Sequence, residues 1–297
     1  MNVLTQSEKH RQCGNGYYRS VTPGLSPLLQ KSRLEQAKQC YTDALKCSST
    51  TEEAASANKN LAMTSWKLAS LGQEQKDLRS QIVFFHKDAL KYFSRALRFG
   101  NDAHIGQSWS ESLVQKMHQS LQECLDFVNN QTNMSDEKTD ILSMACQLIP
   151  AGEFKANISI LYVEHLIGKA IDLFQDRKCL SILYDCHQPL EEAKRYGRSN
   201  KDILSEVGVM SEEVTMLTAV AEARQALETG DSLKKKILTT EEDLNIDMVW
   251  EVLDWYKKAI LLTREKNLEL EAIAMCRMGI IYDSMLKLKS KARPYFK

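Results

Sequence analysis

The sequence predicts an all-α protein in which antiparallel helix pairs stack side by side as an α-solenoid. Along most of the 297 residues, apolar side chains recur at intervals of three and four, the period of an amphipathic helix. The chain has only 12 Gly and 5 Pro, fewer than the many tight turns of an all-β protein require. Short polar breaks separate the amphipathic runs, as expected where consecutive helices form hairpins.

The clearest pair lies near the C-terminus, over residues 247–288. Its two amphipathic runs flank a polar break at residues 263–267. Because neither run can bury its apolar stripe alone, this hairpin requires neighbouring helices.

The first half of the chain opens with residues 1–27, where Gly and Pro interrupt a polar stretch and predict an irregular N-terminal arm. Ser26 followed by Pro27 is a typical helix start. From there, residues 28–297 are expected to form a single helical-repeat domain with a soft break near residue 150, at Pro150 and Gly152. The apolar stripes predict helices over residues 28–47, 52–71, 74–99, 107–129 and 135–148.

The second half continues the same alternation. Ser211 is expected to cap a helix that Gly230 ends. Residues 231–247 read as a charged connector, with Lys234 to Lys236 facing Glu241 to Asp243. The remaining expected helices cover residues 154–175, 179–186 and 189–196, and a short apolar patch follows at 198–208.

The composition excludes some classes of function but does not identify one. The 39 Lys and Arg balance the 39 Asp and Glu, so bulk charge predicts no nucleic-acid partner. The first residues lack the apolar run of a signal peptide, and no stretch is apolar enough for a membrane span. The 8 cysteines are scattered without paired spacing, which favours free thiols in a reducing, cytoplasmic setting.

No motif indicates catalysis, a metal or a cofactor. The sequence contains neither a G-x-S-x-G elbow nor a Gly-rich phosphate loop. Cys179, Cys186 and His187 form the densest Cys/His group, but their spacing is not that of a zinc site. We therefore expect a protein that is not an enzyme, and we keep an enzyme that uses Cys179 and His187 as an alternative.

The helical pattern resembles the tetratricopeptide repeat family. The second helix of that repeat carries Ala, an aromatic residue four positions later, and Ala three positions after that. The first helix carries a small apolar pair ending in Gly, with Tyr three positions on. Matching positions are Ala37/Tyr41/Ala44, Ala89/Phe93/Ala96, Val252/Tyr256/Ala259 with one replacement, and Met278-Gly279/Tyr282. The resemblance implies a right-handed, degenerate α-solenoid with a concave groove lined by the first helix of each pair.

Some tetratricopeptide domains hold a partner's C-terminal carboxylate with Lys, Asn and Arg on successive first helices. Asn60 resembles the Asn of the second repeat, and Lys91 and Arg95 resemble the Lys and Arg of the third. Trp66 and Lys67 follow Asn60 along the same expected helix, which completes a candidate peptide-binding set. Two departures favour ordinary solvated charge as the alternative. The first repeat's residues would fall in the arm, and Lys91 and Arg95 belong to a second-helix pattern.

The first functional hypothesis is a non-catalytic adaptor or scaffold module that binds a protein partner's peptide or helix in the groove. A second is a vesicle-fusion adaptor similar to the soluble attachment proteins, which are also all-helical. A third is a structural, self-associating region of a longer protein, in which the C-terminal hairpin supports a homodimer.

Overall fold

The computed structural model describes residues 4–239 and 245–296, and the described residues form helices and loops without a strand. The all-α prediction is confirmed. The chain forms two compact units, Met1–Ala151 and Gly152–Lys297, whose boundary lies at the soft break predicted near residue 150.

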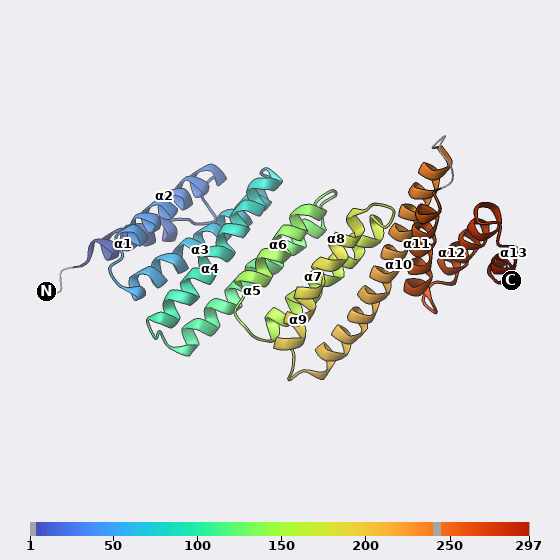
Figure 1. Ribbon diagram of the computed structural model, residues 1–297. Helices are drawn as coiled ribbons and strands as arrows, with labels where there is room; N and C mark the ends of the chain where they lie inside the picture. Colours follow the sequence, from blue (N-terminus) through green and yellow to red (C-terminus); the bar gives the residue numbers. More distant parts are fainter. Residues whose placement is uncertain (1–3, 240–244, 297) are drawn as a thin grey trace. The chain divides into compact units, whose positions relative to one another are not determined.

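In the first unit, each helix packs against the next along the chain, and α4 also contacts α6 (Figure 1). Helices begin and end close to the predicted positions except at the N-terminus. The unit consists of α1 (Gln6–Arg19), α2 (Pro27–Lys46), α3 (Thr51–Gln75), α4 (Arg79–Asp102), α5 (Gln107–Asn129) and α6 (Ser135–Leu148).

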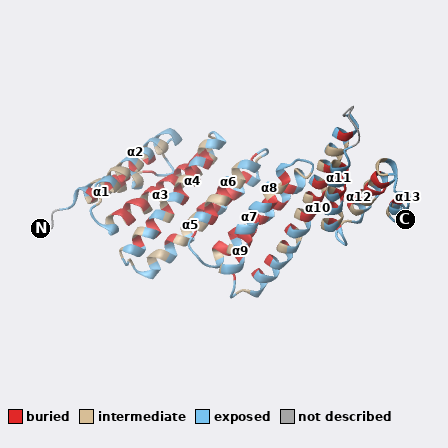
Figure 2. Cartoon of the chain, viewed as in Figure 1, coloured by how far each residue is buried: buried red, intermediate tan, exposed pale blue. Residues whose placement is uncertain are grey.

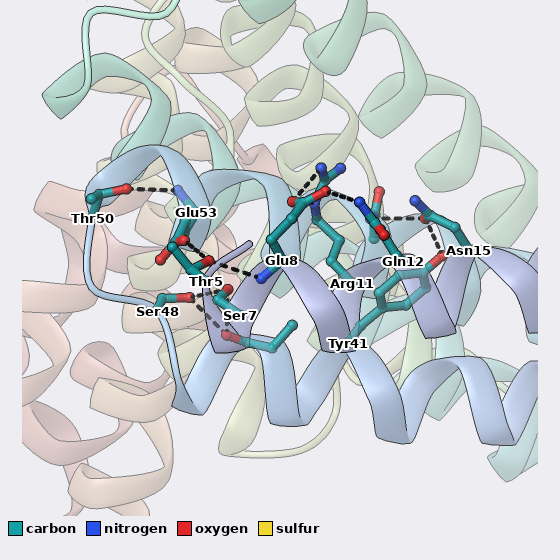
Figure 3. Close-up of polar contacts among 12 residues, drawn as sticks. Thr5, Ser7, Glu8, Arg11, Gln12, Asn15, Tyr41, Ser48, Thr50 and Glu53 are labelled. Atoms are coloured by element: carbon teal, nitrogen blue, oxygen red, sulfur yellow. Dashed lines mark hydrogen bonds and ion pairs between the residues drawn. The ribbon is translucent and has the colours of Figure 1, made fainter. Parts of the chain in front are cut away.

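The prediction of an irregular arm over residues 1–27 is wrong, because most of that segment is helix α1. The Thr5 side chain caps the helix by accepting the Glu8 N–H at 3.1 Å. Ser7 Oγ donates to the Ala44 carbonyl at 2.9 Å, and Thr5 Oγ1 donates to Glu53 (Figure 3). These tertiary bonds, with burial against α2, offset the low helix propensity of two glycines, roughly 1 kcal/mol each.

Consecutive helices of the first unit run antiparallel. Ser7 near the start of α1 meets Ala44 near the end of α2. In the next pair, Trp66 of α3 lies edge-on to Phe93 of α4, with ring centroids 6.4 Å apart. Gln73, further along α3, bonds His86, which comes earlier in α4, at 3.0 Å.

A glycine that accepts a tyrosine ring fixes the contact between α1 and α2. A Cβ built on Gly14 would lie 2.6 Å from Tyr41 Cε1, so only glycine allows this approach. Tyr41 is 2% exposed, and its hydroxyl donates to Asn15 Oδ1 at 2.8 Å (Figure 3). The ring is therefore held both by packing and by a hydrogen bond.

The second unit contains α7–α13, joined in the last part by a π-helical turn and a 3₁₀ turn. Helices α7, α8 and α9 pack on one another and on α10, which pairs with α11. The bounds are α7 (Glu153–Asp172), α8 (Lys178–Asp185), α9 (His187–Tyr196), α10 (Lys201–Thr239), α11 (Ile246–Thr263), α12 (Leu268–Ile280), the π turn Ile281–Met285, α13 (Lys289–Ala292) and the 3₁₀ turn Arg293–Phe296.

Helix α10 is a single helix of 39 residues, where the sequence predicts a patch, a shorter helix and a connector. Ser211 does not cap a helix; its hydroxyl donates to the Val207 carbonyl at 2.7 Å within α10. Gly230 does not end a helix either, because it receives the ring of Tyr256 from α11. The rest of the predicted connector, residues 240–244 with Glu241 to Asp243, lies outside the described residues.

The predicted C-terminal hairpin is confirmed as α11 and α12. Asn267 caps α12 by accepting the Leu270 N–H at 3.0 Å. The apolar stripe of α11 is buried, as the red residues of Figure 2 show, and Val249, Val252, Leu253 and Tyr256 are each 0% exposed.

The glycine–tyrosine contact recurs between α10 and α11. A Cβ on Gly230 would lie 2.6 Å from Tyr256 Cε1, and the Tyr256 hydroxyl donates to Asp231 Oδ1 at 2.7 Å. In both units, then, a glycine and the Asn or Asp after it hold a tyrosine of the following helix.

The glycines provide a test with matched controls. We expect Gly14→Ala to lower the free energy of unfolding by about 1–3 kcal/mol, because the added methyl group displaces a buried ring. Gly16→Ala, in the same helix with open space around it, should raise it by about 0.5–1 kcal/mol. Urea unfolding measures both. Equal effects of the two substitutions would contradict the role assigned to the Gly14–Tyr41 contact.

His86 should make the stability depend on pH. It is 0% exposed, and burial lowers its pKa from 6.5 to about 4. Between pH 6.5 and pH 4, His86 is therefore protonated in the unfolded chain but neutral in the folded protein. The free energy of unfolding that His86 contributes above pH 6.5 is lost as the pH falls towards 4. From pH 7 to pH 5 we expect a loss of about 2 kcal/mol from His86, measured by urea unfolding.

The control for this pH dependence separates His86 from other groups. His86→Gln should reduce the loss between pH 7 and pH 5, whereas His104→Asn, at an exposed position, should leave it unchanged. Burial also lowers the pKa of His118 to about 4, so part of the slope should persist in His86→Gln. An unchanged slope in His86→Gln would refute the assignment.

Candidate functional site

Side chains of α1, α3 and α5 meet on one surface, which we call the α1–α3–α5 face. These three helices alternate along the chain with α2, α4 and α6. Asn60 Nδ2 of α3 donates to Asn15 Oδ1 of α1 at 3.5 Å. Glu123 of α5 accepts Trp66 Nε1 at 2.7 Å and Ser70 Oγ at 3.3 Å, both from α3.

One cation from each of the three helices contributes positive charge to this face. The charges of Lys116 on α5 and Arg11 on α1 both act on Lys59 of α3. Arg11 forms an ion pair with Glu8, with its Nη2 2.5 Å from Oε2. Within the described part of the chain, the side chain of Lys59 makes neither a hydrogen bond nor an ion pair, and its backbone belongs to helix α3.

Burial, followed by repulsion from Lys116 and then Arg11, lowers the pKa of Lys59. Each of these causes disfavours the charged form of the ammonium group. A partly buried cation with two like charges nearby costs the free protein stability. An anion bound at this position would relieve that cost, so Lys59 is a candidate binding group.

Asn15 adds a hydrogen-bond donor to the same face. Its side-chain oxygen accepts from both the Tyr41 hydroxyl and the Asn60 amide. Because this oxygen already accepts two hydrogen bonds, the group of Asn15 that can still bond a ligand is its NH₂ group, which is a donor. Cations beside an amide donor suit a carboxylate, which accepts charge-assisted hydrogen bonds.

The residues predicted from sequence separate into two groups. Asn60, Trp66 and Lys67 lie on α3, and Asn60 and Trp66 contact the neighbouring helices of the face. Lys67 places its ammonium group 4.9 Å from the centre of the Tyr18 ring. Lys91 and Arg95 are exposed on α4, so they lie outside the three helices of the face.

Sequence reasoning missed Arg11, Asn15, Lys59 and Lys116. The first two were hidden by the expectation of an irregular arm. The available signal was Thr5 followed three residues later by Glu8, a typical helix start, with Arg11 and Asn15 four apart beyond it. Lys59 precedes Asn60, but only packing distinguishes a partly buried lysine from a solvated one.

An open cavity of about 710 Å³ adjoins the face. Glu123 is part of its lining, so the cavity begins where α3 and α5 are bonded to each other. Gln73, Lys76, Asp126 and Phe127 contribute to the remaining wall.

At the alternative site, the surroundings of Cys179 disfavour a nucleophilic thiolate. Cys179 is 1% exposed, and burial raises its pKa, which disfavours the reactive thiolate. Burial raises the pKa of Cys186 to about 12 as well. His187 stacks on the Tyr184 ring, with centroids 6.4 Å apart.

In the part of the chain that the structure describes, no cluster of three or more His, Cys, Asp and Glu could hold a metal ion. Nor does any described helix have the length and apolar character required to span a bilayer.

No protein-family model matches the chain, and a comparison with curated proteins also finds no match. The resemblance to tetratricopeptide repeats thus rests on the residue patterns quoted above, and the site is argued from its own geometry.

Lys59 allows a test of the electrostatics that needs no ligand. We expect Lys59→Met to raise the free energy of unfolding by up to about 1 kcal/mol, because it removes a repelled charge and keeps the aliphatic stem. Lys91→Met, at an exposed position on α4, should change it by less than about 0.5 kcal/mol. Urea unfolding at low ionic strength measures both. Destabilisation by Lys59→Met would show that Lys59 has a stabilising anionic partner in the free protein.

Proposed function

We propose that the chain is a non-catalytic interaction module whose α1–α3–α5 face binds an acidic segment of a partner protein. The observation that carries the proposal is Lys59, which lies near the charges of Arg11 and Lys116 and has no anionic partner within the described residues. A group that lowers stability in the free protein and would be neutralised by a ligand is typical of a binding site.

The proposed ligand supplies carboxylates. Each charge-assisted hydrogen bond from Lys59, Lys116 or Arg11 to a carboxylate would contribute about 1.5–3 kcal/mol where water is excluded. The Asn15 amide would donate to the same acidic group or to the backbone of the bound segment. A segment that extends beyond these residues along α3 would reach Trp66 and the adjoining cavity.

A tetratricopeptide-like, right-handed arrangement of the helices is part of the proposal. It is supported by the alternation in which α1, α3 and α5 supply the face while α2 and α4 supply the Ala-aromatic-Ala pattern. In such stacks the first helices line a concave groove, which orients an extended peptide or a helix. The module would then act as an adaptor or as the scaffold region of a larger protein.

The test is a pull-down from cell extract with the whole chain as bait, quantified by mass spectrometry. We expect an acidic partner whose recovery falls at least about tenfold in Lys59→Glu and Lys116→Glu, since each loses an attraction and gains a repulsion. Lys91→Glu is the matched control and should retain the partner. Recovery should also fall as the salt concentration rises.

A partner retained equally by all three variants would place binding elsewhere on the molecule. A homodimer of unchanged stability in every variant, without an acidic partner, would favour the self-association hypothesis instead.

A further inference from the structure

Two cysteines lie next to each other across the contact between α1 and α2. Cys40 Sγ and Cys13 Sγ are 3.6 Å apart. Cys13 is exposed and Cys40 is partly exposed, so a soluble oxidant can reach the pair. By contrast, Cys124, Cys146, Cys179 and Cys186 are buried.

The backbones of α1 and α2 lie close together next to Cys13 and Cys40. Cys13 immediately precedes Gly14, and Cys40 immediately precedes Tyr41. The Gly14–Tyr41 packing therefore brings the two helices together one residue away from the thiols. A disulfide requires a short separation between the two backbones, and the sulfur atoms would need to approach by only about 1.5 Å to reach bonding distance.

From this geometry we propose that Cys13 and Cys40 form a reversible disulfide that joins α1 to α2. The bond would close a loop containing the connection between the two helices, and it would fix α1 to the rest of the first unit. In a reducing compartment both thiols remain free, so the bond would form in response to an oxidant.

The reaction with glutathione disulfide illustrates the chemistry. The exposed Cys13 thiolate attacks one sulfur of glutathione disulfide and releases one glutathione thiolate. Cys40 then transfers its proton to solvent and attacks Cys13 Sγ in the mixed disulfide, releasing the second glutathione thiolate. Two protein thiols are oxidised, and one glutathione disulfide is reduced to two glutathione molecules.

The order of the two steps follows from the surroundings of the thiols. Burial, with hydrogen bonding to Cys13, raises the pKa of Cys40 to about 11, so Cys40 is protonated at neutral pH and is the weaker first nucleophile. Cys40 becomes effective in the second step because its target sulfur lies beside it.

The disulfide would also affect the α1–α3–α5 face, because α1 carries Arg11 and Asn15. Fixing α1 against α2 would hold these two side chains beside Lys59. This consequence rests on the proposed function, whereas formation of the disulfide does not.

The experiment uses the full chain treated with excess glutathione disulfide at pH 8, followed by alkylation of the remaining thiols. We expect a species that has lost two hydrogen atoms and that yields one Cys13–Cys40 linked peptide after proteolysis. Its Tm should exceed that of the reduced protein by about 5 °C, and dithiothreitol should reverse both changes.

Three variants identify the bond. Cys13→Ser and Cys40→Ser should each lose the linked peptide and the Tm shift. Cys47→Ser, which removes an exposed cysteine just beyond the end of α2, should retain both. Only glutathione adducts on Cys13, or linked peptides that involve Cys47 or Cys276, would overturn the proposal even if the module binds its acidic partner. Failure of acidic binding with an intact Cys13–Cys40 bond would overturn the proposed function alone.

Discussion

The close approach of two helices at a glycine, filled by an aromatic ring of the next helix, is the contact on which both units depend. Gly14 receives Tyr41 in the first unit, and Gly230 receives Tyr256 in the second. Each tyrosine is also hydrogen-bonded to the residue that follows the glycine, Asn15 or Asp231. The same principle operates where Gly100 meets Trp109 and where Gly279 meets Phe296. A side chain on Gly14 or Gly230 would displace the buried tyrosine ring that packs there.

This contact also assembles the candidate site. Without the Gly14–Tyr41 packing, the polar and Gly-containing α1 would have little reason to be helical, since isolated helices of this length are marginal in water. Once docked, α1 presents Arg11 and Asn15 beside Lys59 and Asn60 of α3. The Tyr41 hydroxyl donates to the side-chain oxygen of Asn15 (Figure 3). The Tyr41 side chain therefore both holds α1 against α2 and orients the Asn15 amide in the candidate site. Packing and the proposed recognition are thus coupled through a single residue, Tyr41.

The proposed binding of an anion rests on the electrostatics of the face. Elsewhere in the first unit, some partly buried lysines have acidic partners: Lys31 lies 2.7 Å from Asp77, and Lys38 lies 2.9 Å from Asp88. Lys59 instead has two cations, Lys116 and Arg11, as electrostatic neighbours. An acidic side chain beside Lys59 would have given the free protein a higher stability than two cations do. Lys59 is therefore the residue at which we propose that an anionic ligand binds.

The sequence by itself determined that the chain is helical and where most helices begin and end, because these features follow from local periodicity and from Gly and Pro at short range. Asn60 was also predicted from sequence as a binding residue, through its resemblance to a repeat position, and that role stays a prediction. Only tertiary structure decided that α1 is a helix, that α10 continues through Gly208 and Gly230, and that Arg11, Lys59 and Lys116 share a face. In a sequence, a glycine predicts the end of a helix. In the structure, a glycine inside a helix can instead be the point where an aromatic ring of another helix packs. Likewise, the sequence does not show whether a lysine is solvated or partly buried, because its burial depends on helices that are distant in the sequence.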